Sequence, residues 1–299
     1  MSGSEDDTTR DALGALDSLL RALVLEPAGE DRFVMTSESP PRFPQVFGGQ
    51  QVAQALLAAG ATVDGLAALS IHAYFADRGF VDRPIEVVVD RVRDGRTMAI
   101  RRVTLSQGER TLLTAIAAFH DNPSEPEHAP PPPDVPGPED TPDFFDWVNA
   151  APAGREGSSQ LWLDVPPPLD VRIGQPQAFL GGAQATDQRS HWLRLPRPVD
   201  GDDLLHSVLL TYASDYFLLD MAVRAHPHPS GWAGVNGISL DHTVWLHRPV
   251  RFDEWHLYTQ DTIALTGHRG LVQGTLHDTE GRLVATVAQD CLLVPMAGG

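Results

Sequence analysis

The chain has 299 residues, of which 42% are hydrophobic and 21% are charged, and its formal net charge is −18. The length fits two domains of ordinary size, and the apolar content is sufficient for a core in each of them. The acidic balance argues against nucleic acid and anionic membranes as partners, because both are bound mainly through cationic side chains.

The N-terminal half begins with a predicted helix over residues 10–24, and a second, Ala-rich helix is predicted over residues 52–59. Four strand-like runs follow, at residues 70–75, 85–92, 97–105 and 111–119. Asp94-Gly95 and Gln107-Gly108 are typical turn sequences between the later runs. This half therefore predicts a helix followed by an antiparallel meander.

A Pro-rich segment separates the two halves. Residues 123–142 hold nine of the 25 prolines, among them four in a row at 130–133. Such a composition favours an extended and exposed chain. We expect the domain boundary there, with an N-terminal domain over residues 1–122, a linker over 123–170 and a C-terminal domain over 171–299.

The C-terminal half repeats the same order of elements. A helix is predicted over residues 205–219, and strand-like runs follow at 238–245, 255–265, 270–276 and 283–294. His72 and His242 are 170 residues apart (242 − 72), and Thr114 and Thr286 are 172 apart (286 − 114). The nearly constant offset indicates a duplicated domain with small changes in its loops.

A helix followed by a meander predicts an α+β fold in which a curved antiparallel sheet wraps round a central helix, the hotdog arrangement. The Ala-rich helix suits this fold because alanine has the highest helix propensity and lets the sheet approach closely. Two such units predict a tandem, or double, hotdog with two antiparallel sheets each wrapped round a central helix. We expect the sheets to join edge to edge, since this removes two exposed edges.

Several common catalytic motifs are absent. All 22 basic residues are arginine, so Schiff-base chemistry, pyridoxal phosphate and the P-loop lack the lysine that they need. The single cysteine, Cys291, excludes disulfides, cysteine zinc sites and iron–sulfur clusters. There is no Gly-x-Ser-x-Gly, His-Glu-x-x-His or glycine-rich dinucleotide loop. We interpret His226 and His228 as solvated loop residues, so the sequence predicts no metal and no cofactor.

Four segments closely resemble the acyl-CoA thioesterase II family in order and spacing. They are Gln-Val-Phe-Gly-Gly-Gln at 45–50, Tyr-Ala-Ser-Asp at 212–215, Ser-Leu-Asp-His-Thr-Val-Trp-Leu-His-Arg-Pro at 239–249 and Val-Ala-Gln-Asp at 287–290. The Asp-His-x-x-Trp-x-His-Arg-Pro string at 241–249 is the most specific of them. The resemblance covers residues 16–293 and is weakest in the linker. It implies a double hotdog that hydrolyses fatty acyl-CoA thioesters and forms homo-oligomers.

The resemblance implies three catalytic residues, Asp215, Ser239 and Gln289, which together hold the attacking water. Ser239 stands where the best-known form of the family has Thr, and it lacks the methyl group that restrains the rotamer. A thioester carbonyl is already electrophilic, so the reaction needs an oriented water, a base and donors for the oxyanion rather than a metal. Aromatic neighbours at 212, 216 and 217 predict that Asp215 is partly desolvated and therefore more basic.

The repeat places this chemistry in one half. With the offset of 172, Gln289 corresponds to Ala117 (289 − 172), which has no polar group. We therefore expect the N-terminal half to supply packing and part of the acyl channel. Because His72 and His242 occur in both halves, we predict a structural role for them.

Direct attack by water is the predicted mechanism. On a regular strand Ser239 and His242 point to opposite faces, so Ser239 has no local base unless the strand is bulged. No cationic residue near Cys291 in the sequence would lower its pKa. Two alternatives stay open, a hotdog enoyl-CoA hydratase, although the Asp-x-Asn-Pro-x-His pattern is absent, and a non-catalytic acyl-CoA-binding scaffold.

The ends of the chain and its apolar runs predict a cytoplasmic protein. The first ten residues are polar and acidic, unlike a signal peptide, and the last residues carry no peroxisomal tripeptide. The apolar runs are far shorter than the ~20 residues of a membrane helix.

Overall fold

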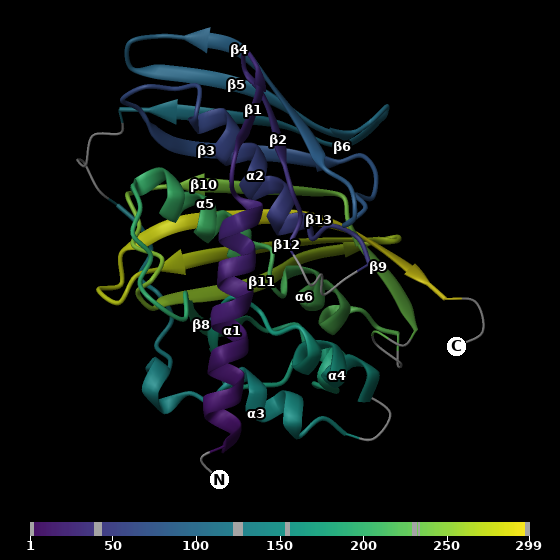
Figure 1. Cartoon of the computed structure of the whole chain (residues 1–299). Helices are drawn as coiled ribbons and strands as arrows, with labels where there is room; N and C mark the ends of the chain where they lie inside the picture. Colours follow the sequence, from purple (N-terminus) through teal and green to yellow (C-terminus); the bar gives the residue numbers. More distant parts are fainter. Residues whose placement is uncertain are drawn as a thin grey trace.

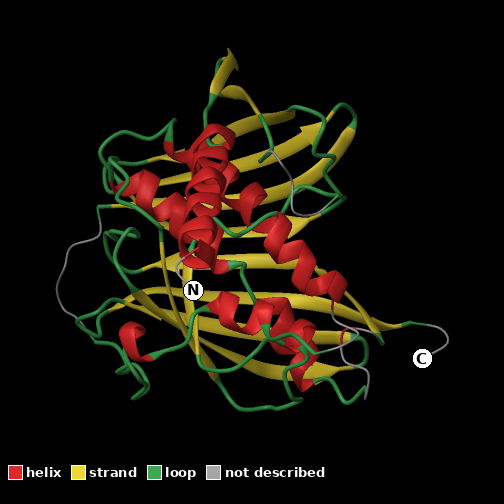
Figure 2. Ribbon diagram, turned by 60° about the horizontal axis from the view of Figure 1, so that its bottom comes forward, coloured by secondary structure: helices red, strands yellow, loops and turns green. Residues whose placement is uncertain are grey.

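The computed structural model describes residues 3–38, 44–121, 128–152, 156–228, 232 and 234–296. Its strands form one antiparallel sheet in the order β1-β2-β4-β5-β6-β3-β10-β13-β12-β11-β8-β7, and β9 pairs with β13. The helices lie against one face of this sheet (Figures 1 and 2). The chain is therefore α+β, as the sequence predicts.

The strands of the N-terminal half are β1 (Glu26–Gly29), β2 (Arg32–Met35), β3 (Ala67–Phe75), β4 (Ile85–Asp94), β5 (Met98–Gln107) and β6 (Arg110–His120). Those of the C-terminal half are β7 (Asp170–Ile173), β8 (Arg189–Arg194), β9 (Val235–Ser239), β10 (Asp241–Leu246), β11 (His256–Thr266), β12 (Arg269–His277) and β13 (Leu283–Pro295). The helices are α1 (Gly3–Ala22), α2 (Gly48–Gly60), α3 (Phe144–Asn149), α4 (Glu156–Asp164), α5 (Asp203–Ser214) and α6 (Leu218–Ala225). Short 3₁₀ helices are η1 (Pro138–Asp140) and η2 (Ala178–Leu180).

The strand order is symmetric about the pair β3–β10. It runs β4-β5-β6-β3 on one side and β11-β12-β13-β10 on the other, and β2 and β8 flank the two ends. At the joint, Ile71 of β3 lies opposite Val244 of β10. The order agrees with a duplicated domain. It also joins the two expected sheets into one, which removes an exposed edge from each half.

Helix α2 is buried on nearly every side. It packs against β3, β4, β5 and β6 and against α5. Ala53, Ala55, Ala58 and Ala59 are fully buried, so small side chains allow the sheet and α5 to approach the helix closely. Helix α1 is tied to it where the Gln54 amide donates to the carbonyl of Ala22 over 2.8 Å.

The single C-terminal helix predicted over residues 205–219 is wrong, because α5 ends at Ser214 and α6 starts at Leu218. Phe217 between them has φ 67°, a left-handed conformation that large side chains rarely adopt. Two side chains of β11 bind the carbonyls that the break exposes. The Tyr258 hydroxyl donates to Ser214 over 2.6 Å, and the Gln260 amide donates to Tyr216 over 2.8 Å. Tertiary hydrogen bonds thus stabilise the break.

The segment expected to be a linker is more structured than its composition predicts. Residues 122–127 lie outside the described residues, and the Pro-rich stretch that follows is tied to the C-terminal half by the Trp192 indole, which donates to Pro136 over 2.9 Å. Beyond it, α3 and α4 bury Phe144 and Trp162. These helices and the strands β1, β2, β7 and β8 are not predicted from the sequence. None of the described helices is both long and apolar enough to cross a membrane.

Candidate active site

Asp215 lies at the break between α5 and α6 and points at the start of α2. Its side chain is 7% exposed, and Oδ2 accepts a hydrogen bond of 2.8 Å from the backbone N–H of Gly49. The N-terminus of a helix carries a partial positive charge, which favours a carboxylate there. The N-terminal half therefore contributes directly to the site, beyond the packing and channel that the sequence predicts for it.

The two glycines at the start of α2 permit this close approach. A Cβ atom at Gly48 would lie 2.9 Å from Asp215 Oδ2 and 3.1 Å from the ring of Phe75. A Cβ atom at Gly49 would collide with the carbonyl oxygen of Tyr212. Side chains at these two positions would push α5 away from α2, so the Gly-Gly sequence is a geometric requirement of the site.

The surroundings of Asp215 are aromatic. Phe47 packs edge-on against Tyr212 and Tyr216 with ring centroids 5.3 and 5.1 Å apart. Burial raises the pKa of Asp215 above its usual range, while His242, the Gly49 N–H and the Gln289 amide oppose the rise. The carboxylate is therefore more basic than an exposed aspartate, in the direction that the sequence predicts.

Ser239 and His242 lie on the same face of the sheet because the strand is bulged between them. The predicted strand over residues 238–245 is in fact β9 and β10. Ser239 is opposite Cys291, and Thr243 is opposite Ala288, so the register shifts by one residue. Leu240 donates its N–H to Asp290 over 2.8 Å, and Asp290 donates its N–H to the Asp241 carboxylate over 2.7 Å. The parity argument for a regular strand does not hold here, since a bulge inserts one extra residue.

Gln289 connects the candidate residues. Its side chain is fully buried on β13. Nε2 donates to Ser239 Oγ over 2.9 Å, and Oε1 lies 2.6 Å from Nδ1 of His242. The Gln289 amide also favours the charged form of Asp215 and so opposes the rise of its pKa. The fold thus brings Asp215, Ser239 and Gln289, all named from the sequence, into one cluster.

His242 also belongs to this cluster, although its place in the site is not predicted from the sequence. The side chain is fully buried, Nδ1 is 3.9 Å from Asp215 Oδ1, and Nε2 is 2.8 Å from the hydroxyl of Ser214. His72 is exposed and packs edge-on against Trp245 at 5.3 Å. The two histidines therefore lie in different environments, and the structural role expected for them stays a prediction. The Asp-His string at 241–242, within the most specific segment, is the signal that could have identified His242.

Cys291 is buried beside Gln289, whose Nε2 lies 3.6 Å from Sγ. Burial raises the pKa of the thiol to about 12, and the hydrogen bond from Gln289 opposes this only in part. At neutral pH the side chain is therefore an uncharged thiol, which is a poor nucleophile.

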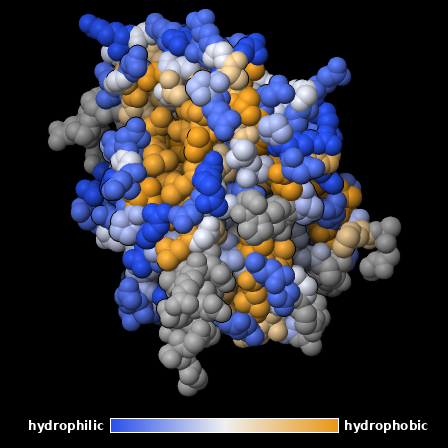
Figure 3. Space-filling view, viewed as in Figure 1, coloured by the Kyte–Doolittle hydropathy of each residue, from blue (hydrophilic) through white to orange (hydrophobic). Residues whose placement is uncertain are grey.

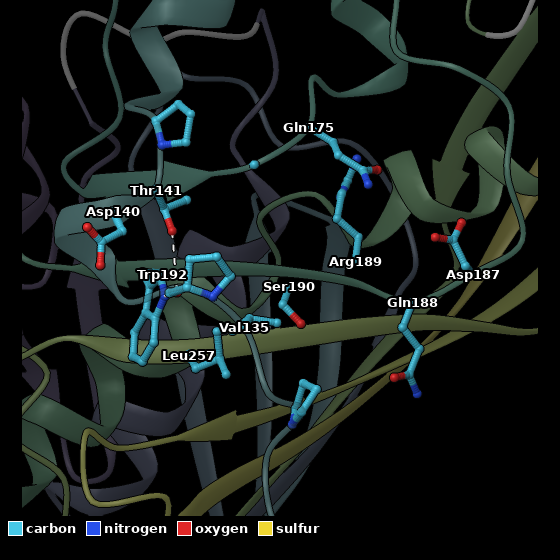
Figure 4. Close-up of a pocket in the computed structure, with 14 residues that line it drawn as sticks. Val135, Asp140, Thr141, Gln175, Asp187, Gln188, Arg189, Ser190, Trp192 and Leu257 are labelled. Carbon is cyan, nitrogen blue, oxygen red and sulfur yellow. Dashed lines mark hydrogen bonds between the residues drawn. The ribbon is translucent and has the colours of Figure 1, made fainter.

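A pocket of about 580 Å³ lies elsewhere, between the Pro-rich segment and the strands β8 and β11 (Figure 4). Trp192 and Ser190 line it from β8, together with the carboxylates of Asp140 and Asp187. Its arginine, Arg189, forms a buried ion pair of 2.7 Å with Asp220. Without a free cation among its described lining residues, this acidic pocket does not suit a polyphosphate ligand.

No three His, Cys, Asp or Glu side chains of the described residues are arranged to hold a metal ion. His226 and His228 are half-buried, and the His228 N–H donates to Nδ1 of His226 over 3.1 Å. This contact engages Nδ1 of His226 within the loop.

Several known proteins are similar to this chain. A family model described as acyl-CoA thioesterase matches residues 167–292, and one described as acyl-CoA thioesterase N-terminal domain matches residues 39–120. Acyl-coenzyme A thioesterase 8 of Mus musculus is 31% identical over 94% of this chain and 90% of its own length. The crystal structure of an acyl-CoA thioesterase II from Mycobacterium marinum has a TM-score of 0.75 at 30% identity and covers 94% of this chain and 100% of that one. A protein of unknown function with a hot dog fold from Alicyclobacillus acidocaldarius has a TM-score of 0.71 at 23% identity, covering 92% and 97% of the two chains.

Proposed function

The chain belongs to the acyl-CoA thioesterase II family, and from this premise we propose that Asp215, Ser239 and Gln289 are its catalytic residues. The enzyme hydrolyses fatty acyl-CoA thioesters to the free acid and coenzyme A. The observation that carries the proposal is the buried cluster round Gln289. Its amide donates to the Ser239 hydroxyl over 2.9 Å and contacts His242, which lies 3.9 Å from the buried Asp215.

Water attacks the thioester carbonyl directly in this mechanism. One hydrogen of the water is donated to Asp215, whose raised basicity suits a general base. One lone pair of the water accepts from Ser239 or Gln289, and the other forms the new C–O bond. The C–S bond then breaks, and the proton held by Asp215 passes to the departing thiolate. Two neutral donors and one carboxylate are sufficient, because a thiolate is a good leaving group.

A thiol-release assay across saturated acyl-CoA chain lengths tests the activity. Intact-protein mass spectrometry during turnover of a slow substrate tests the mechanism, and we expect no acyl adduct on Ser239 or Cys291. An adduct that forms and decays at the turnover rate would replace direct water attack by nucleophilic catalysis. Cys291→Ala should keep the wild-type rate, since the thiol is uncharged at neutral pH.

The two alternative functions are less well supported. A hydratase needs a histidine that exchanges protons with the substrate, whereas both ring nitrogens of His242 are engaged by Ser214 and Gln289. Product analysis with saturated and enoyl-CoA substrates separates hydrolysis from hydration. A non-catalytic scaffold would release no thiol from any acyl-CoA.

The fold that we propose is a tandem of two hotdog units, each with a sheet wrapped round a central helix, α2 or α5. The symmetric strand order and the hot dog neighbour support it. The domains span residues 1–122 and 171–299, with 123–170 between them, and limited proteolysis should cut first in the Pro-rich part. Figure 3 shows an apolar area in the part of the surface where Figure 1 places α2 and α5. Such an area is suited to bind a fatty acyl chain.

We also propose that the protein forms a homo-oligomer in the cytoplasm. On the sheet, three large apolar side chains are exposed on neighbouring central strands, namely Tyr74 (67%), Ile116 (41%) and Trp245 (37%). Exposed apolar groups on adjacent strands are typical of an interaction surface. Sedimentation analysis of the wild type and of Tyr74→Glu tests this, and a monomeric wild type would refute it.

A further inference from the structure

The side-chain amide of Gln289 has two chemically different ends, and the site uses both. Nε2 faces Ser239 Oγ at 2.9 Å, and Oε1 faces Nδ1 of His242 at 2.6 Å. An amide oxygen only accepts hydrogen bonds, so this orientation requires a hydrogen on His242 Nδ1. If the amide were turned over, its oxygen would face Ser239, and the donor for water would be lost.

Ser214 fixes the other side of the imidazole. Its hydroxyl is 2.8 Å from His242 Nε2 and 2.8 Å from the carbonyl of Thr211. If the hydroxyl hydrogen goes to Thr211, Nε2 must donate to Ser214 and the ring carries hydrogens on both nitrogens. If it goes to Nε2, the ring is the neutral tautomer with its hydrogen on Nδ1. With the Gln289 oxygen facing Nδ1, both arrangements place a hydrogen on Nδ1.

The charged surroundings favour the same orientation. Asp215 Oδ1 lies 3.9 Å from Nδ1, and a carboxylate attracts an N–H and repels a lone pair. Cys291 is an uncharged thiol on the β13 side, and the hydroxyl of Tyr258 is directed to the carbonyl of Ser214. The Cys291 S–H is only a weak donor and the Tyr258 hydroxyl is directed elsewhere, so neither competes strongly with His242 for the Gln289 oxygen.

We propose that His242 is a positioning residue, whose Nδ1–H locks the Gln289 amide with its N–H directed at Ser239 and the attacking water. The inference rests on the proposed function of the site. His242 does not touch the substrate, because its side chain is fully buried and both its ring nitrogens are bound within the protein. It acts on the reaction only through Gln289 and Asp215.

Paired variants at position 242 separate positioning from packing. His242→Leu removes the N–H at similar volume, and we expect kcat to fall about 100-fold, the effect of removing one aligned donor, while KM changes less than about threefold. His242→Asn keeps an N–H close to the position of Nδ1. We expect its kcat to be at least about tenfold higher than that of His242→Leu. Equal loss in both folded variants, or a normal kcat in His242→Leu, would overturn the proposal.

A spectroscopic measurement on the wild-type enzyme covers the case in which these variants do not fold. In protein with ¹⁵N-labelled histidine, Nδ1 of His242 should carry a hydrogen throughout the pH range of activity, identified as the histidine signal that Gln289→Ala shifts. A bare Nδ1 in the active enzyme would refute the proposal. A wild-type enzyme without thiol release would refute the proposed function instead, so the two failures are distinguishable.

Discussion

Asp215 is under two opposing influences. Burial next to Tyr212 and Tyr216 raises its pKa, whereas His242, the Gly49 N–H and Gln289 stabilise the carboxylate. Burial is the larger influence, so the group is a stronger base than an ordinary aspartate yet remains a hydrogen-bond acceptor at the N-terminus of α2. This combination is suited to taking one proton from a water and releasing it again.

Asp215→Asn should remove the base without disturbing the fold. We expect kcat to fall by about 10²–10⁴-fold, the contribution of a positioned general base. The unfolding temperature at pH 7 should be equal to or above that of the wild type, because an uncharged side chain avoids the cost of burying a carboxylate. Steady-state thiol release and thermal unfolding measure the two effects. A folded variant with a near wild-type rate would end the assignment of Asp215 as the base.

The pH dependence of activity should report the raised pKa of Asp215. The base works only when ionised, so kcat/KM should fall as the pH decreases through the folded-state pKa, above the ordinary value of 3.8. In the unfolded chain the pKa of this carboxyl is the ordinary, lower one. The free energy of unfolding should therefore decrease as the pH rises from the unfolded-state pKa through the folded-state pKa. Rate profiles and denaturant unfolding test both signs. In Asp215→Asn this pH-dependent loss of stability should be absent.

At the scale of single elements, three irregularities build the site. Helix α5 stops at Ser214, the chain is bulged at Leu240 and Asp241 between the consecutive strands β9 and β10, and α2 starts with two glycines. Each irregularity moves a side chain to where a regular element would not hold it. The break directs Asp215 at the start of α2, the bulge places Ser239 and His242 on one face, and the glycines let α5 approach α2. Local deviations of this kind are typical of functional sites.

Gly48→Ala should impair catalysis through the geometry of α2. The new Cβ atom would lie 2.9 Å from Asp215 Oδ2 and must displace the carboxylate. A displacement of about 1 Å in a reacting group can lower the rate by about 10²-fold, and we expect a loss of that order in kcat.

Gly14→Ala is the matched control for Gly48→Ala, because Gly14 is in α1 with no atom within 4 Å of its added Cβ. This change should leave kcat unaltered and stabilise the fold by about 0.5–1 kcal/mol, since alanine is the better helix former. Thiol release and chemical unfolding of both variants compare the two positions. Wild-type kcat in Gly48→Ala would show that the glycine pair is unnecessary for the site.

At the scale of the whole molecule, the two halves share both a sheet and a core. Strand β3 pairs with β10, α2 packs on α5, and the cluster of buried hydrophobic residues runs from Leu16 to Leu293 without interruption between the halves. The active-site contact between Gly49 and Asp215 crosses the same boundary. The N-terminal half has Ala117 at the position that corresponds to Gln289, so it lacks this catalytic candidate. It nevertheless contributes Gly49 to the site of the C-terminal half.

We therefore expect the chain to unfold as one cooperative unit. Separating the halves would expose the β3 and β10 edges and the faces of α2 and α5, so neither half should persist alone once the other has unfolded. Scanning calorimetry should show one transition, and loss of thiol release should coincide with it. Two resolved transitions, with activity lost in the first, would contradict the shared core.

The sequence by itself determined most of the regular elements and the identity of the three candidate residues. Strand alternation, turn glycines and the Ala-rich helix are local signals, because each depends on side chains a few residues apart. They correctly predicted α2, β3 to β6 and β11 to β13 within a few residues. The specific string at 241–249 identified the family without any knowledge of the fold.

Only the tertiary structure decided how these residues form a site. The end of α5 is stabilised by Tyr258 and Gln260, which lie 44 residues further along the chain, and Asp215 binds Gly49 across 166 residues. The bulge depends on the register between β13 and the strands β9 and β10. No local pattern encodes such partners. His72 and His242 are the same residue type at corresponding positions of the two halves. His242 is buried beside Asp215, whereas His72 is exposed. The packing of the two halves decides this difference, because the residue type is the same.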